Sequence, residues 1–160
     1  LHFDFGNKKG CLQENCGPNC ENKKYTGESC DRFVELWNLV FMQFYHHPNG
    51  HRDNLPAPSI DTGMGLERAT IIMQNAPTMY ETDLFTPLIS KVLDLTTQTY
   101  GKSKETDYAI RAVAEHSRSS TFLTADGVVP SNEGRGYVLR RVIRRAIRLG
   151  EKLGIKDDLV

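Results

Sequence analysis

The chain has 160 residues, enough for one domain or two small ones with a hydrophobic core. Its 20 Lys and Arg residues balance 20 Asp and Glu residues, so net charge alone points to no class of partner. No apolar run approaches the ~20 residues of a membrane-spanning helix, and no signal peptide is evident. We therefore expect a cytoplasmic protein without a membrane partner.

All four cysteines lie in a loop, residues 6–31, that follows an expected strand at residues 1–5. They are Cys11, Cys16, Cys20 and Cys30. Four thiols this close in sequence are able to bind zinc tetrahedrally, although the spacing is looser than two Cys-x-x-Cys pairs. Free thiols, or disulfides in a secreted protein, are the alternatives, so the sequence commits no metal here.

The longest apolar run covers residues 33–45. Its β-branched and aromatic content predicts a strand buried on both faces, although a helix also fits a continuous apolar run. In a strand, Asn38 and Val40 share one face, and Asn38 is a lone amide in an apolar row. A buried amide needs hydrogen-bond partners, so Asn38 is either a core residue bonded to a loop or a substrate ligand.

A turn with three histidines, residues 46–51, follows this run. We expect it to close a hairpin between the apolar strand and the next one. Three histidines suggest a metal, but no acidic or thiol ligand nearby has a matching spacing. A solvent-exposed loop is therefore expected.

A strand, a glycine turn and a helix are expected in residues 59–74. The strand carries Asp61, and Gly63 and Gly65 permit a sharp turn and the close approach of a ligand. Apolar spacing then predicts a helix from residue 66, which Pro77 ends.

The start of this helix has the chemistry of an anion site. A glycine turn at a helix N-terminus offers free N–H groups, and Arg68, one turn in, is able to grip phosphate oxygens with its planar fork. The pattern Gly-x-Gly is weak evidence by itself, and a plain strand–turn–helix corner is the alternative.

Apolar spacing and capping residues predict three helices in the second half of the chain. The first begins at an N-cap, Asp83, and closes at Gly101. The second covers residues 107–125 and carries His116, which we expect to be a hydrogen-bonded packing residue rather than a catalyst. The third covers residues 137–153.

The third helix carries a basic stripe. Residues 131–153 contain seven basic and two acidic side chains. Such a stripe is commonly a solvated helix face, but so many nearly unopposed cations are equally typical of a nucleic-acid surface.

Three strings resemble the alanyl-tRNA synthetases, a family of class II aminoacyl-tRNA synthetases, in the order found there. They are Trp37–Phe41, Asp61–Arg68 and Asp126–Arg145. The middle string, Gly-x-Gly-x-Glu-Arg after Asp-Thr, resembles motif 3 of class II enzymes. The resemblance implies an α+β fold. Residues 1–78 would end an antiparallel-sheet catalytic domain, and residues 79–160 would begin an α-helical tRNA-recognition domain.

The resemblance implies two sets of substrate ligands. For L-alanine, Asn38 would hold the carboxylate, Val40 would pack on the methyl group and Asp61 would bind the ammonium group. Gly63 would leave room for the amino acid beside Asp61. For ATP with Mg²⁺ the ligands are Gly65, Glu67 and Arg68. No catalytic side chain is implied, because positioning and charge stabilisation do most of the work in such a reaction.

The C-terminal string resembles the region that recognises the acceptor stem of tRNA(Ala), whose identity signal is a G·U pair. By its place in this string, the resemblance makes Asn132 the candidate base reader, and an A-form stem displays base edges in a shallow minor groove that an amide is able to read. Arginines hold phosphates and fix the register of the complex. The candidate arginines are Arg135, Arg140, Arg141, Arg144 and Arg145.

The resemblance implies an alanine–tRNA ligase. In the family pattern, motifs 1 and 2 precede the residue that matches Leu1, and editing and C-terminal domains follow the match to Val160. We therefore expect an internal fragment that is inactive alone. A non-catalytic RNA-binding module and a zinc-stapled structural fragment are the alternatives. The joint presence of Asn38, Asp61 and Arg68 favours the enzyme.

Overall fold

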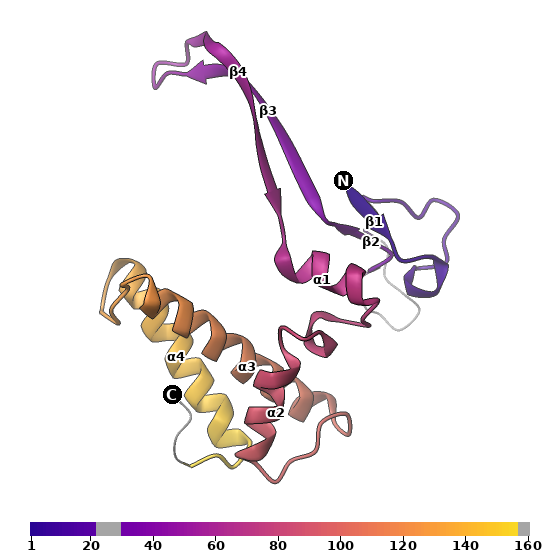
Figure 1. Ribbon diagram of the computed structural model, residues 1–160, viewed down its shortest axis with the longest axis vertical. Coiled ribbons are helices and arrows are strands. Elements are labelled where there is room, and N and C mark those ends of the chain that lie inside the picture. The colour runs from indigo at the N-terminus through magenta and orange to yellow at the C-terminus, as the bar shows by residue number, and fades with distance from the viewer. Residues whose placement is uncertain (22–29, 157–160) are drawn as a thin grey trace. The chain divides into compact units, whose positions relative to one another are not determined.

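The computed structural model describes residues 1–21 and 30–156 and confirms the predicted α+β fold of antiparallel strands and helices (Figure 1). Two compact units are present, Leu1–Asn75 and Ala76–Val160. The strands and α1 belong to the first unit, and α2, α3 and α4 belong to the second. Within the described ranges, no helix is long and apolar enough to cross a membrane.

A small sheet opens the first unit. Strand β1 (His2–Asp4) pairs antiparallel with β2 (Phe33–Glu35), and the 3₁₀ turn η1 (Asn7–Lys9) lies in the loop between them. Arg32 donates from Nε and Nη2 to the two carboxylate oxygens of Asp4, each at 2.8 Å. This bidentate contact, with a hydrogen bond from the Gly6 N–H, lowers the pKa of Asp4 to about 2. The ends of the loop are therefore joined at its base.

A long hairpin follows. Strand β3 (Trp37–His46) pairs antiparallel with β4 (Arg52–Met64), so the predicted hairpin and its turn are confirmed. Strand β4 starts seven residues before the expected residue 59. The register is irregular between Met42 and Phe44, where four residues of β4, 55–58, lie opposite Gln43. Both prolines of β4 fall in this bulge, where no ladder N–H is required.

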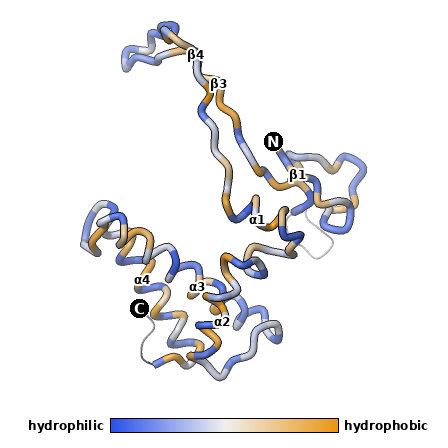
Figure 2. Tube along the Cα trace, in the orientation of Figure 1, coloured by the Kyte–Doolittle hydropathy of each residue, from blue (hydrophilic) through white to orange (hydrophobic). Residues whose placement is uncertain are grey.

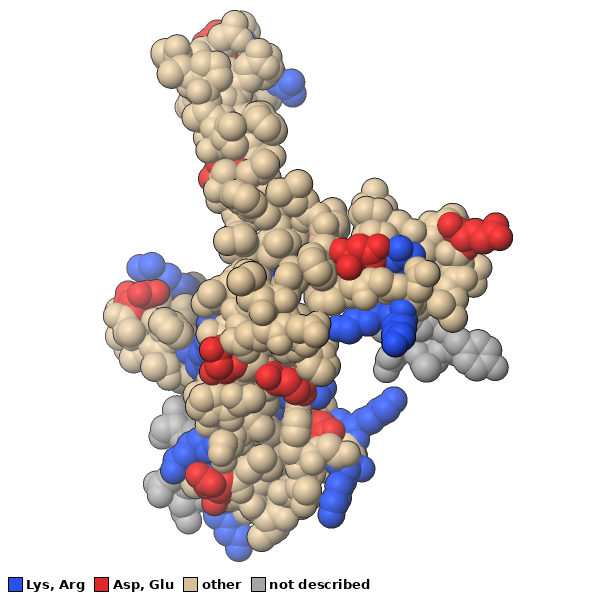
Figure 3. Space-filling model, turned by 45° about the vertical axis from the view of Figure 1, so that its right-hand side comes forward, with Lys and Arg blue, Asp and Glu red and all other residues tan. Residues whose placement is uncertain are grey.

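The predicted burial of residues 33–45 on both faces is wrong. Every residue of β3 is exposed, and Leu36 separates β3 from β2. In the described part of the chain, β3 has β4 as its one sheet neighbour, and the residues on both faces of β3 are exposed. Figure 2 shows hydrophobic residues along β3, and in the space-filling view the hairpin carries few charged side chains (Figure 3).

Helix α1 (Leu66–Gln74) continues directly from β4, at the predicted start. Its last residue is Gln74 and its C-cap is Asn75, so Pro77 is not the residue that ends it. Asn75 has a left-handed backbone, with φ 50°, and its N–H bonds the carbonyl groups of Ile71 and Ile72. Asn tolerates this conformation better than most residues and so serves as a C-cap.

The second unit contains η2 (Met79–Glu81), α2 (Thr86–Asp94), α3 (Lys104–Ala125) and α4 (Gly134–Lys152), with α3 and α4 side by side in Figure 1. Its core is built from α2, α3, the end of α4 and the segment after it. The buried members are Phe85, Ile89, Val92, Ala109, Ile110, Ala112, Val113, Ala114, Leu149, Leu153 and Ile155.

The structure corrects the bounds of these helices. Phe85, not Asp83, is the N-cap of α2, which ends at Asp94 rather than near Gly101. Just after α2, Thr96 donates a hydrogen bond of 2.5 Å to the Leu153 carbonyl. Helices α3 and α4 each begin three residues earlier than predicted, at Lys104 and Gly134.

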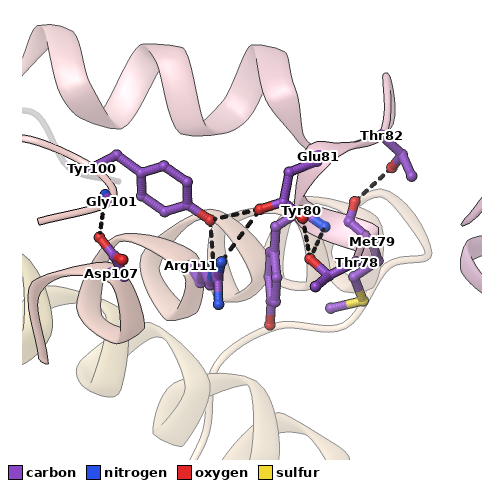
Figure 4. A network of polar contacts seen from close by, with 9 residues as sticks. All are labelled: Thr78, Met79, Tyr80, Glu81, Thr82, Tyr100, Gly101, Asp107 and Arg111. Carbon is purple, nitrogen blue, oxygen red and sulfur yellow. Dashed lines mark hydrogen bonds and ion pairs between the residues drawn. The ribbon is translucent and has the colours of Figure 1, made fainter. Parts of the chain in front are cut away.

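A polar network joins η2 to α3 in the second unit (Figure 4). Arg111 donates to the Tyr100 hydroxyl at 2.5 Å and to Glu81 at 3.3 Å, and the Tyr100 hydroxyl donates to Glu81 at 3.2 Å. The Arg111 guanidinium also lies 4.9 Å from the centroid of the Tyr80 ring. Burial, with the nearby Glu115 carboxylate, raises the pKa of Tyr80 to about 12. These contacts fix the start of the helical unit.

Candidate functional site

The strand register brings four predicted alanine ligands together. Asn38 lies directly opposite Gly63, and Val40 lies directly opposite Asp61. Directly opposite residues point to the same face of an antiparallel pair, with Cβ atoms about 4.5–5.5 Å apart. The pairs are two residues apart along each strand, so all four positions share one face.

This face combines four different chemical features. Asn38 offers an amide, Val40 a small branched apolar group, Asp61 a carboxylate, and Gly63 a surface without a side chain. Val40 is 51% exposed, so its methyl groups are open to a ligand. A Cβ atom added at Gly63 would lie 3.3 Å from Asn38 Oδ1, which shows that the glycine keeps space beside the amide.

The predicted phosphate ligands lie where β4 passes into α1. Gly65 is the N-cap of α1 and has an extended backbone, and Glu67 and Arg68 follow in the first turn. Arg68 donates from Nη1 to the Glu35 carbonyl at 2.6 Å, which ties its guanidinium to the end of β2. The arginine is thus held at a helix N-terminus, a position suited to an anion.

A basic groove of about 540 Å³ runs along α4. We call it the α4 groove. Its lining residues come from α3 and α4 and are Tyr108, Tyr137, Arg140, Arg141, Arg144, Arg145, Arg148, Leu149 and Lys152. Four of the five predicted tRNA-binding arginines are in this set. Arg135 is exposed at the start of α4 and is not brought to the groove.

Asn132 is linked to the α4 groove through a side-chain contact. It lies exposed in the segment before α4, and its Oδ1 accepts a hydrogen bond from Nη1 of Arg140. Its amide nitrogen is then the end of the side chain left to face a ligand. Arg140 therefore orients the candidate base reader.

Sequence reasoning missed two tyrosines of the α4 groove. Tyr108, on α3, accepts a hydrogen bond of 2.6 Å from Arg145, and the Tyr137 ring lies 5.9 Å from the Arg141 guanidinium. Tyr137 was detectable, because it stands three and four residues before Arg140 and Arg141 on one helix. Tyr108 is far away in sequence, so only the packing of α3 on α4 reveals it.

The histidine turn differs from the expectation in one respect. Asp53 supplies the nearby carboxylate that the spacing did not suggest. Its two oxygens lie 2.8 Å from His47 Nε2 and 2.9 Å from His51 Nε2. The Nε2 atom of each histidine is thus hydrogen-bonded to Asp53 at this exposed hairpin tip, and we assign no metal to it.

His116 also differs from the expectation. Its Nε2 is buried and has no hydrogen-bond partner among the described residues. Burial lowers the pKa of His116, the Arg145 cation lowers it further, and the Glu115 carboxylate opposes the shift. His116 is thus a partly buried packing residue, and its burial favours the neutral imidazole.

The cysteine loop forms a compact thiol cluster. The sulfur atoms of Cys11, Cys16, Cys20 and Cys30 all lie within 4.8 Å of one another. Across residues 1–21 and 30–156, this is the one group of Cys, His, Asp or Glu side chains arranged to hold a metal ion. A hydrogen bond from the Gln13 N–H lowers the pKa of Cys11 to about 7, whereas burial, with the neighbouring sulfurs, raises the pKa of Cys16 to about 11.

The fold and the arrangement of strand, glycine turn and arginine agree with a comparison against protein families. Residues 4–160 match the model of the class II (A) tRNA synthetases, so the chain belongs to this family of class II aminoacyl-tRNA synthetases. The match includes the cysteine loop.

Individual relatives carry the name alanine–tRNA ligase. The chain is 54% identical over 160 residues to that of Dehalococcoides mccartyi and 51% identical over 161 residues to that of Lawsonia intracellularis, covering all of this chain in both. It is 59% identical over 130 residues, 81% of the chain, to that of Psychromonas ingrahamii. The matched segments span 18%, 17% and 14% of these relatives.

Proposed function

We propose that this chain supplies the L-alanine and ATP contacts of an alanine–tRNA ligase, together with a surface for the acceptor stem of tRNA(Ala). One observation carries the proposal. The register of β3 and β4 gathers an amide, a branched apolar side chain, a carboxylate and a bare glycine on one face. These features match the carboxylate, methyl and ammonium groups of alanine.

Each chemical group of alanine has its own partner among these four residues, matched by charge or by size. Asp61 pairs with the ammonium group, and the Asn38 amide donates to the carboxylate. Val40 packs on the methyl group, and Gly63 leaves room beside it. A pocket this small discriminates weakly against glycine or serine, because a methyl or hydroxyl group changes binding by only about 1–3 kcal/mol.

The residues at the start of α1 would bind ATP. The Arg68 fork holds the γ-phosphate, and Gly65 lets the backbone approach the nucleotide. Mg²⁺ binds chiefly through the phosphates and one or two carboxylates, and Glu67 is the carboxylate of this turn that fits that role. When bound, Mg²⁺ would neutralise part of the negative charge of the ATP phosphates.

The reaction requires positioning rather than a protein nucleophile. The alanine carboxylate attacks the α-phosphate of ATP, forming alanyl-adenylate and releasing pyrophosphate. The 3′-terminal hydroxyl of the tRNA then attacks the alanyl carbonyl and releases AMP. Asp61, Asn38 and Arg68 hold the two reactants in line for the first step.

A chimeric enzyme tests the alanine site. The chain replaces the matching segment of the Dehalococcoides mccartyi alanine–tRNA ligase, and alanine-dependent exchange of labelled pyrophosphate into ATP is measured. We expect exchange, and we expect Asp61→Ala to lower kcat/KM for alanine at least about a hundredfold, because the ammonium group loses its counter-ion.

Asp53→Ala is the matched control. Asp53 is also an exposed carboxylate of β4, but it bonds His47 and His51 at the hairpin tip. This variant is expected to keep exchange within about twofold of the unmodified chimera. Equal loss in Asp53→Ala and Asp61→Ala would show that the strand, not the ligand contact, is what the assay detects.

The proposed tRNA surface is the α4 groove. Guanidinium groups along one helix face suit the phosphates of an A-form stem, and the exposed Tyr108 and Tyr137 add aromatic surface. Arg144→Ala is expected to weaken binding of tRNA(Ala) by this chain and to reduce the slope of log K against log salt by about one.

Lys91→Ala is the control for the groove, because Lys91 is a cation of the same helical unit in the last turn of α2. An equal change in slope for both variants would argue for diffuse electrostatic binding. The alternative function, an RNA-binding module without catalysis, is supported by this same groove. It predicts RNA binding by the chain together with a chimera that lacks exchange.

A further inference from the structure

The geometry of the thiol cluster is that of a single tetrahedral site. Cys11 and Cys20 Sγ are 3.5 Å apart, Cys16 and Cys30 Sγ are 3.6 Å apart, and all four sulfurs lie within 4.8 Å of one another. Four thiolates about 2.3 Å from a central Zn²⁺ lie about 3.8 Å from each other. A small inward or outward shift of each side chain brings the sulfurs to that geometry.

The arrangement is tighter than two separate thiol pairs require. All four cysteines are free, and two disulfides would need closeness only within each pair. Here the sulfurs of one pair also approach those of the other. A common ligand explains this convergence, whereas pairwise oxidation does not.

The described part of the loop has no hydrophobic core to hold it. In the described residues of the first unit, Cys11 is the one buried apolar side chain, and every other buried apolar residue lies at Ala76 or beyond. Few apolar side chains therefore hold the described part of the loop, and a structural metal is one way to hold such a loop.

The backbone beside Cys11 is strained in a way that sequence preference does not explain. Leu12 has a positive φ of 61°, although it is neither glycine nor asparagine, and its side chain is 80% exposed. This conformation costs about 1 kcal/mol or more for a residue with a Cβ atom. Exposure brings Leu12 no compensating burial, and the residue before it, Cys11, has its sulfur in the thiol cluster.

Two tight turns present the next cysteines. The Cys16 N–H donates to the Gln13 carbonyl at 3.1 Å, and the Cys20 N–H donates to the Gly17 carbonyl at 3.0 Å. Each turn ends on a cysteine. The loop is closed at its base by Arg32, whose carbonyl accepts from the Phe5 N–H at 2.8 Å. Cys16 and Cys20 are thus positioned by local hydrogen bonds of their own backbone.

We propose that Cys11, Cys16, Cys20 and Cys30 bind one Zn²⁺ in a closed structural site. Each thiol gives up its proton on binding, and the four sulfurs leave no open position for water or substrate. The site is separate from the alanine and ATP contacts proposed above. Its effect on them is indirect, because β2 ends at Glu35, whose carbonyl holds Arg68.

Metal content of the full 160-residue chain tests the site without any activity assay. Purified under reducing conditions, the chain is expected to carry one zinc per molecule by elemental analysis. Replacement with Co²⁺ is expected to give the strong sulfur-to-cobalt charge-transfer absorption and the d–d bands of a tetrahedral tetrathiolate site. Both measurements use the unmodified chain, so neither depends on a variant that fails to fold.

Cysteine and histidine variants locate the ligands. Cys16→Ser and Cys30→Ser are expected to lower zinc content at least about tenfold at limiting metal. The double variant His47→Ala with His51→Ala, which removes two ligand-type side chains at this unit's hairpin tip, is expected to keep one zinc.

Three outcomes would overturn the assignment. The first is a metal-free chain with four thiols that react at full rate with a thiol reagent. The second is a mass deficit of two disulfides after purification without reductant. The third is stoichiometric iron in place of zinc, which the same sulfur geometry accepts.

Discussion

A Cβ atom on residue 63 would lie 3.3 Å from Oδ1 of Asn38, the residue directly opposite it across the β3–β4 ladder. Gly63→Ala therefore requires the Asn38 amide to shift by a few tenths of an ångström. We expect KM for alanine in the chimeric enzyme to rise about tenfold or more, because the amide is displaced and the methyl pocket narrows.

Thr62→Ala separates this effect from a general disturbance of the strand. Thr62 adjoins Gly63 in β4, but adjacent residues point to opposite faces. Its KM for alanine is expected to stay within about twofold of the unmodified value. If Gly63→Ala left KM unchanged, the amide would not be a ligand of alanine.

Arg68→Lys tests the fork at the start of α1. Lysine keeps the positive charge but loses the planar pair of donors, one of which now reaches the Glu35 carbonyl at 2.6 Å. We expect KM for ATP to rise about tenfold to a hundredfold while KM for alanine changes little. A rise in KM for alanine alone would show that Arg68 contacts alanine rather than the phosphates of ATP.

Local pattern was sufficient to predict the hairpin and the start of α1. Gly63 and Gly65 mark where β4 passes into the helix, and the alternation of β3 already put Asn38 and Val40 on one face. The pairing of these residues with Asp61 and Gly63 needed the register. That register depends on the bulge opposite Gln43, whose place the two prolines of β4 suggest but whose length they do not specify.

Features that depend on contacts distant in sequence were not predictable. Burial of β3 was predicted from composition, but composition does not say whether a second layer covers the strand. Just after the early end of α2, Thr96 bonds the carbonyl of Leu153, far along the chain. Tyr108 enters the α4 groove only because α3 packs on α4. Tertiary packing overrides local propensity in each case.

Gly136→Ala is expected to disturb the segment that carries Asn132. Gly136 is buried in the first turn of α4, and a Cβ atom there would overlap Ser131 Oγ and the Val129 carbonyl. Because one of these is backbone, the segment must move. We expect the free energy of unfolding to fall by about 1–3 kcal/mol and tRNA binding to weaken.

Gly17→Ala is the control for this substitution, since nothing lies within 4 Å of an added Cβ atom at that position. Urea unfolding followed by helical circular dichroism measures both variants. Unchanged stability and unchanged RNA binding in Gly136→Ala would contradict a fixed segment before α4.

His116 predicts how the stability of the helical unit depends on pH. Burial holds the pKa of His116 below the ordinary 6.5, and Arg145 on α4 acts in the same direction against Glu115 on α3. As the pH falls through 6.5, the unfolded chain takes up a proton that the folded chain does not. The unfolded state then binds more protons, so the free energy of unfolding decreases on acidification until the folded-state pKa is reached.

His116→Gln removes this proton uptake and is expected to flatten the decline in the free energy of unfolding between pH 7.5 and pH 5.5, measured by urea unfolding at each pH. His46→Gln, at an exposed position of β3, is expected to keep the decline. An identical pH dependence in His116→Gln and the unmodified chain would mean that the His116 imidazole titrates alike in both states, which its buried Nε2 argues against.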